Sequence, residues 1–337
     1  MHVTLQQWLA ARRSRFWHEK GALDLLVDAT EQGSLPMSGF VLRSRLSRRP
    51  STPRTDDEAP PGGPAARTPR IVPAEPWADG VPALIFQTWK VRQPLPANYR
   101  YWSSTLSAHN PRRAHIVWDD QDNRDFIASD FPWFLPCYDR YPREIYRVDI
   151  VRLFFLYRFG GLYADMDTEC LCPVDKALGA GDVILGAMGP DRACIYSIPN
   201  AVMAAKPRQL FWLLAIANAI DRAALCAKTA DFIARGPEYL TGAVLLRDSL
   251  LQYEAHGAEE VRQHVARSLP PAVAVADAAA GRVAVLPPAT WYPINWNNLW
   301  HQRFRRELLR RRTPLTPGEV RALFPAAHMV SYWTHAW

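Results

Sequence analysis

Apolar residues recur at roughly helical spacing over the first part of the chain, from residue 3 to residue 32. Gly33 follows, and glycine is typical of the residue just after a helix. Arginines and carboxylates fill the positions between the apolar residues. The segment 1–33 is therefore predicted to be a helical segment of amphipathic character.

Residues 34–80 have a different pattern. Pro, Arg, Ser, Thr and Gly dominate "SRRPSTPRTDDEAPPGGPAARTPR", and large apolar side chains are rare in it. Such a segment cannot bury enough apolar surface to offset its ordering entropy. We expect a flexible Pro/Arg-rich linker over 34–80.

Short apolar runs alternate with longer helical patterns throughout residues 81–337. The runs predicted to be strands are "ALIFQTW", "RAHIVW", "LYADMDTEC", "DVILGA" and "RVAVLP". Helices are predicted over 98–108, 121–129, 143–159, 207–226, 240–253 and 258–267, and "FPWFLPCYDRYP" is predicted to be an aromatic loop. This alternation predicts an α/β sandwich with a mostly parallel central sheet, preceded by an N-terminal helical extension.

Composition and charge narrow the class of protein. The chain is 48% apolar, so it can bury a sizeable core, and its formal net charge of +7 favours anionic partners. The sequence has no RNP-like or zinc-finger pattern, so nucleic acid is not an expected partner. The longest apolar run, "FWLLAIANAI", is too short to cross a bilayer. Five cysteines, an odd number, fit a reducing cytoplasm better than a disulfide framework.

Two carboxylates, Asp165 and Asp167, follow the most apolar predicted helix. If "LYADMDTEC" is one strand, Tyr163, Asp165 and Asp167 share a face of it. Two adjacent carboxylates repel each other unless a cation lies between them, and such oxygen ligands suit Mg²⁺ or Mn²⁺. The alternative is a solvated strand end, because Asp-x-Asp alone is common and Asp120 and Asp122 form a second example.

Asp149 and Arg152 lie three residues apart within the same apolar helix, so they occupy one face. Charged side chains in such surroundings are seldom buried without partners. They form either a simple ion pair or part of a polar site with the two carboxylates that follow.

The stretch "RVDIVRLFFLYRFGGLYADMDTE" resembles the glycosyltransferases of family 32, which contain a sugar-binding region with a DXD motif. "IFQTWK", "NPRRAHIVWDD", "SIPNAVMAAKPRQLFW", "GPEYLTGAVLL", "VLPPATWYPINW" and "HMVSYWTHAW" also resemble segments of that family. The resemblance covers about residues 81–337 and implies a GT-A type, Rossmann-like fold for that domain.

The resemblance also implies roles for individual residues. Catalysis would depend on Asp149, Arg152, Asp165 and Asp167. Asp149 and Arg152 would bind sugar hydroxyls, Asp165 the ribose and donor sugar, and Asp167 the Mn²⁺ or Mg²⁺ ion, with Asp165 nearby. Tyr163 would lie beside the donor.

For Trp89 and three positions near the C-terminus, the resemblance implies less definite roles. Trp89 would lie near the nucleotide base, unless it is a core tryptophan at a strand end. Ser331 stands where many family members have a histidine, and the resemblance makes it a weak cation ligand, with His335 as the alternative. Trp333 would contact phosphate or base.

The implied function is a metal-dependent retaining glycosyltransferase. It would use a UDP- or GDP-sugar and a polysaccharide, lipopolysaccharide or glycolipid acceptor. Alternatives are a secreted effector that glycosylates a host protein and a noncatalytic sugar-nucleotide-binding module. The basic run "HQRFRRELLRRR" is either a solvated surface or a peripheral contact with the inner membrane face, in a cytoplasmic protein.

Overall fold

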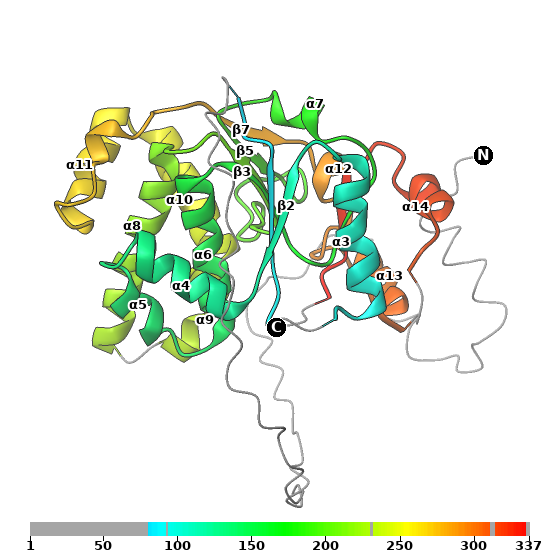
Figure 1. The fold of residues 1–337 in the computed structure, drawn as a ribbon, viewed down its shortest axis with the longest axis horizontal. Coiled ribbons are helices and arrows are strands. Elements are labelled where there is room, and N and C mark those ends of the chain that lie inside the picture. Colours follow the sequence, from blue (N-terminus) through cyan, green and yellow to red (C-terminus); the bar gives the residue numbers. More distant parts are fainter. Residues whose placement is uncertain (1–79, 92–93, 230–231, 311–313, 335–337) are drawn as a thin grey trace, which may run out of the picture. The chain divides into compact units, whose positions relative to one another are not determined.

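A computed structural model describes residues 80–91, 94–229, 232–310 and 314–334 (Figure 1). The predicted helical segment 1–33 and all but the last residue of the predicted linker 34–80 lie outside the described residues. The same holds for His335. The expected α/β fold of the remaining domain is confirmed, and its elements are labelled as in Figure 1.

The central sheet has six strands in the order β2-β1-β3-β6-β5-β7. All neighbouring strands are parallel except that β6 runs antiparallel to both β3 and β5. The bounds of these strands are β1 Leu84–Thr88, β2 Ala114–Trp118, β3 Gly161–Ala164, β5 Val183–Gly186, β6 Val202–Ala205 and β7 Val283–Leu286. A separate antiparallel pair joins β4 Thr168–Cys170 to β8 Met329–Ser331. The mostly parallel sheet predicted from the sequence is therefore present.

Helices cover both faces of the sheet (Figure 1). The longer ones on one side are α4 Asp120–Asp130, α6 Glu144–Arg158, α8 Leu210–Thr229, α10 Ala243–Ala255 and α11 Ala258–Ser268. The shorter α5 Leu135–Arg140 and α9 Phe232–Leu240 join them there. On the other side lie α3 Ala97–His109, α7 Asp175–Leu178, α12 Pro288–Trp291, α13 Leu299–Arg310 and α14 Pro317–Leu323.

Side chains alternate between the two faces along the buried strands, as the pleat requires. In β1, Leu84 and Phe86 join the core beneath α6 and α8, whereas Ile85 joins the core beneath α3 and α12. In β3, Leu162 joins the core beneath α3 and α12, whereas Tyr163 joins the core beneath α6 and α8. Tyr163 therefore faces α6, the helix that bears the predicted polar pair.

Two predicted elements differ from the structure. "LYADMDTEC" is not one strand, because β3 ends at Ala164 and a turn over 165–167 leads into β4, which belongs to the other sheet. The predicted aromatic loop contains the helix α5, a single short segment with too few residues to show a helical period.

Helix α8 bears on the expectation that no segment is apolar enough over a sufficient length to cross a membrane. Among the described helices, one has the length and composition to cross a membrane, with a window over Leu210–Ala227 of mean hydropathy 1.5. The sequence prediction considered only residues 211–220 of this helix. However, 61% of this window is buried inside the protein, and α8 packs against α6, α10 and α11. Its apolar character is that of a core helix.

Candidate functional site

Helix α6 places Asp149 and Arg152 side by side, three residues apart, with both side chains buried. The helix ends at Arg158, and Gly160, two residues later, has a left-handed φ of 65° that favours glycine. A Cβ there would lie 2.7 Å from the carbonyl oxygen of Ala205 in β6. This close approach lets the chain turn at once into β3, so that the end of β3 lies beside the polar face of α6.

The Arg152 guanidinium joins both halves of the motif. It is 2.9 Å from an oxygen of Asp149 and 3.1 Å from Oδ1 of Asp165. Its Nη1 also donates to the carbonyl of Asn200, and its Nε donates to that of Val148. The guanidinium carbon lies 4.6 Å from the centre of the Tyr163 ring. The simple Asp149–Arg152 pair considered from the sequence is thus part of a larger buried network.

Asp165 lies just beyond β3, where Tyr163 donates its hydroxyl proton to Oδ1 at 2.8 Å. Its backbone N–H donates to Ala201, and its carbonyl accepts from the side chain of Gln87 in β1. The prediction that Tyr163 and Asp165 meet is consistent with this geometry. Because the backbone is fixed from two neighbouring strands, the carboxylate is held in a defined position.

Asp167 does not follow the strand alternation assumed from the sequence, because it lies in the turn. Its Oδ2 accepts hydrogen bonds from the backbone N–H and the hydroxyl of Thr334, at 2.7 and 2.8 Å. Its carbonyl accepts from the backbone of Tyr332. The chain after β8 therefore positions the second carboxylate of the motif.

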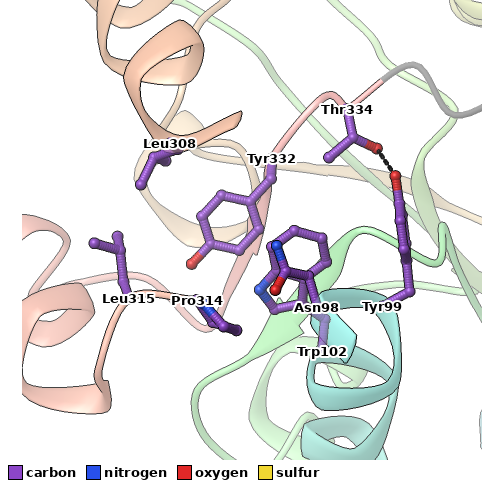
Figure 2. Close-up of a pocket in the computed structure, with 8 residues that line it drawn as sticks. All are labelled: Asn98, Tyr99, Trp102, Leu308, Pro314, Leu315, Tyr332 and Thr334. Carbon is purple, nitrogen blue, oxygen red and sulfur yellow. Dashed lines mark hydrogen bonds between the residues drawn. The ribbon is translucent and has the colours of Figure 1, made fainter. Parts of the chain in front are cut away.

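Trp89 is 9% exposed and follows β1 directly. Its ring lies 4.8 Å from that of Tyr99, and the Tyr99 hydroxyl donates to Thr334 (Figure 2). Trp89 is therefore linked to Asp167 through two side chains. This placement is compatible with both interpretations made from the sequence, a base contact and a core tryptophan.

Tyr99 and Thr334 also line a pocket of about 190 Å³, whose lining residues are drawn in Figure 2. Aromatic and apolar side chains make up most of its lining, with Trp102 and Tyr332 at its centre. In the described part of the chain, none of the four motif residues lines it. It adjoins the candidate site through Thr334 and is not the site itself.

Burial and charge shift the titration of the carboxylates. Burial raises the pKa values of both Asp149 and Asp165, and the charge of Arg152 opposes the shift at each. Repulsion from Asp167 raises the pKa of Asp165 further. A cation between Asp165 and Asp167 would relieve this repulsion.

The free oxygens of the motif fit a divalent cation. Neither Oδ2 of Asp165 nor Oδ1 of Asp167 accepts a hydrogen bond from a described residue, and the Ser331 hydroxyl is buried with no described partner. Nowhere in the described ranges do three His, Cys, Asp or Glu side chains gather into a metal site. Mg²⁺ often binds through one or two carboxylates plus substrate phosphates and water, so two aspartates suffice.

Trp333 lies beside the site in a left-handed backbone conformation, with φ of 51°. Its ring stacks on Tyr292, and its indole N–H donates to the carbonyl of Ile294. The Trp333 indole N–H, which could otherwise donate to a phosphate, is thus already bonded. A contact between the Trp333 ring and the donor stays a prediction.

Two residues of the site were not anticipated from the sequence. Asn200 donates its side-chain amide to Asp149 at 3.0 Å, and Thr334 binds Asp167. Both residues lie within segments that resemble the family. However, no sequence spacing relates either residue to Asp149, Arg152, Asp165 or Asp167. Only the tertiary structure brings them there.

Comparisons with known proteins find relatives of the region that contains this site. Residues 96–184 match the family described as the glycosyltransferase sugar-binding region containing DXD motif. Inositol phosphoceramide mannosyltransferase 3 of Schizosaccharomyces pombe is 40% identical over 98 residues, which are 29% of this chain and 27% of that protein. The initiation-specific alpha-1,6-mannosyltransferase of Candida albicans is 33% identical over 110 residues, 31% of this chain and 29% of that protein.

The matched segments thus span less than a third of these two relatives. Among solved structures, the PaToxG glycosyltransferase aligns with a TM-score of 0.40 and 15% identity, covering 57% of this chain and 82% of that one. The matched family region contains Asp149, Arg152, Tyr163, Asp165 and Asp167. Residues 96–184 therefore resemble the sugar-binding region of the DXD-containing glycosyltransferases, and the resemblance to family 32 is confirmed.

Proposed function

We propose that this protein is a metal-dependent retaining glycosyltransferase that takes its sugar from a UDP- or GDP-sugar. The observation that carries the proposal is the placement of Arg152 between Asp149 and Asp165, with Asp167 held beside them by Thr334. The guanidinium offers donors and the two carboxylates beside it offer acceptors in fixed geometry, which suits sugar hydroxyls.

In this proposal each motif residue has one task. Asp149 and Arg152 orient the sugar, Asp165 contacts the donor sugar and ribose, and Tyr163 fixes Asp165. Asp167 holds Mn²⁺ or Mg²⁺, aided by Asp165, with Ser331 as a further candidate ligand. The bound cation would stabilise charge on the departing nucleoside diphosphate. The acceptor hydroxyl would attack from the side that the nucleotide leaves, with positioning and electrostatic stabilisation as the main sources of acceleration.

The names of the relatives suggest the class of acceptor. The S. pombe relative is named for mannosyl transfer to inositol phosphoceramide, and the C. albicans relative for initiation of α-1,6-mannosylation. We propose a saccharide or lipid-linked acceptor. Helix α13 supports contact with an anionic membrane, because Arg306 and Arg310 are exposed on it and Leu299 at its start is 57% exposed. We place the protein in the cytoplasm, at the inner face of that membrane.

The test is a panel of UDP- and GDP-sugars assayed for hydrolysis and transfer with Mn²⁺, Mg²⁺ and EDTA. Asp167→Asn keeps an acceptor for Thr334 but removes the charge that holds the cation. We expect this variant to keep its thermal stability within about 1 kcal/mol and to lose cation-dependent turnover by about 100-fold or more.

Two results would contradict the proposal. Turnover that is unchanged in Asp167→Asn would exclude Asp167 as the cation ligand. Binding of a sugar nucleotide by the wild-type protein without hydrolysis or transfer to any acceptor would favour the noncatalytic binding module instead.

A further inference from the structure

Arg305 in α13 has a charge that the described part of the protein does not neutralise. No described carboxylate forms an ion pair with it, and its Nε is buried without a hydrogen-bond partner. Its single described hydrogen bond runs from Nη1 to the backbone carbonyl of Trp333, at 2.8 Å. A partly buried guanidinium with an unsatisfied N–H is costly to maintain unless an anion binds it.

One peptide unit separates Arg305 from Asp167. The carbonyl of that peptide, from Trp333, accepts from Arg305, and its N–H, from Thr334, donates to Oδ2 of Asp167 at 2.7 Å. The bond lengths of a peptide keep the bonded guanidinium nitrogen within about 8 Å of this carboxylate oxygen. Burial, together with the charge of Arg306, lowers the pKa of Arg305, and the negative charge of Asp167 partly opposes this shift.

The two groups have opposite charges but do not touch, since the peptide lies between them. A ligand that contacts both must offer an anion to Arg305 and must be compatible with a carboxylate, either directly through hydroxyls or through a shared cation. A diphosphate with its divalent cation satisfies both conditions, and it is long enough to reach from one group to the other.

We infer that Arg305 binds the diphosphate of the donor and stabilises it as the leaving group. This inference rests on the proposed function and adds a residue outside the matched region 96–184. Arginine suits the task because its fork of N–H groups matches phosphate oxygens and keeps its charge at any working pH. Arg305 would bind through its free Nε and its second terminal nitrogen while Nη1 keeps Trp333 in place.

The test compares Arg305→Gln with Arg306→Gln, a matched control, because Arg306 is the exposed neighbour on the same helix. Binding of UDP and GDP is measured by calorimetry with Mg²⁺, and binding of uridine and guanosine by competition. We expect Arg305→Gln to weaken diphosphate binding about tenfold and to leave nucleoside binding unchanged. Arg306→Gln should bind all ligands as the wild type does, and Arg305→Lys should recover part of the lost affinity.

Equal losses for nucleoside and diphosphate would show that Arg305 only holds the backbone of Trp333, which overturns the inference. Unchanged diphosphate binding in a folded Arg305→Gln protein would overturn it as well. These outcomes leave the proposed function intact. Failure of the wild type to bind either UDP or GDP would instead refute the proposed donor, and the role of Arg305 with it.

Discussion

Arg152 is the residue on which the polar part of the core depends. It is 2% exposed, and it balances two buried carboxylates from different elements, Asp149 in α6 and Asp165 after β3. Buried ion pairs stabilise a protein little compared with apolar replacements, but removing one partner leaves an uncompensated charge. The network therefore constrains which single substitutions the fold tolerates.

We expect Arg152→Met to lower the free energy of unfolding by about 3 to 5 kcal/mol, because Asp149 and Asp165 would lose the guanidinium that pairs with both of them. Urea denaturation followed by tryptophan fluorescence measures the change. The double variant Asp149→Asn/Arg152→Met should recover part of the loss, because it removes one of the two stranded charges. Equal stability of the single variant and the wild type would exclude the bridging role.

At this scale the sequence predicted which residues meet where the spacing is local. The three-residue interval in a helix brings Asp149 to Arg152, and the two-residue interval at a strand end brings Tyr163 to Asp165. The partner of Asp167 could not be predicted in this way. Thr334 lies 167 residues away, and no local pattern specifies a contact at such a separation.

Among the elements, the two Asp-x-Asp pairs show how context decides the role of a short motif. Asp122 belongs to the first turn of α4, where its side chain accepts from the backbone of Asp119 while the Asp119 side chain accepts from the backbone of Asp122. This reciprocal arrangement is a capping box. Asp165 and Asp167 instead lie in a turn between two sheets, with oxygens left free for a ligand.

We expect Asp119→Ala to destabilise the protein by about 1 to 2 kcal/mol, because the first turn of α4 would lose a side-chain acceptor. Asp119→Asn should retain most of the stability, since its amide oxygen still accepts from Asp122. Thermal unfolding of the two variants side by side measures the difference. If both lose the same amount, the charge of Asp119 rather than the cap is what stabilises the helix end.

Long elements were predictable from the sequence, and junctions were not. Helix α6 follows the predicted segment 143–159 closely because its apolar pattern is long, and strand β2 lies within the predicted segment 113–118. The break between β3 and β4 was missed, since the alternation of Tyr163, Asp165 and Asp167 continues in the sequence through a point where the backbone turns. Pairing with a distant strand, β8, determines where β4 begins.

For the molecule as a whole, stability should depend on pH through His115 in β2. Its Nε2 lies 2.9 Å from the Gln87 side-chain oxygen, which can only accept, and its Nδ1 lies 2.7 Å from the Ser107 hydroxyl. These partners fit a neutral imidazole with the proton on Nε2. Burial lowers the pKa of His115 to about 4, and Gln87 in turn holds the backbone of Asp165.

As the pH falls, His115 binds a proton near pH 6.5 in the unfolded chain but only near pH 4 in the folded protein. Stability should therefore fall as the pH is lowered from about 6.5 to about 4, by up to about 3 kcal/mol from this residue. Unfolding free energies of wild type and His115→Gln, measured between pH 4 and 7.5, test this. The difference between the two profiles isolates the histidine, and parallel profiles would contradict the expectation.

The pairing of β4 with β8 affects how the protein reaches its native state. Thr168 pairs with Ser331, so the chain must close a loop of more than 160 residues before Asp167 meets Thr334. Contacts of such separation form slowly compared with the local contacts among α4, α5 and α6. The contact between Asp167 and Thr334, and with it the candidate site, should therefore form later in folding than these helical contacts.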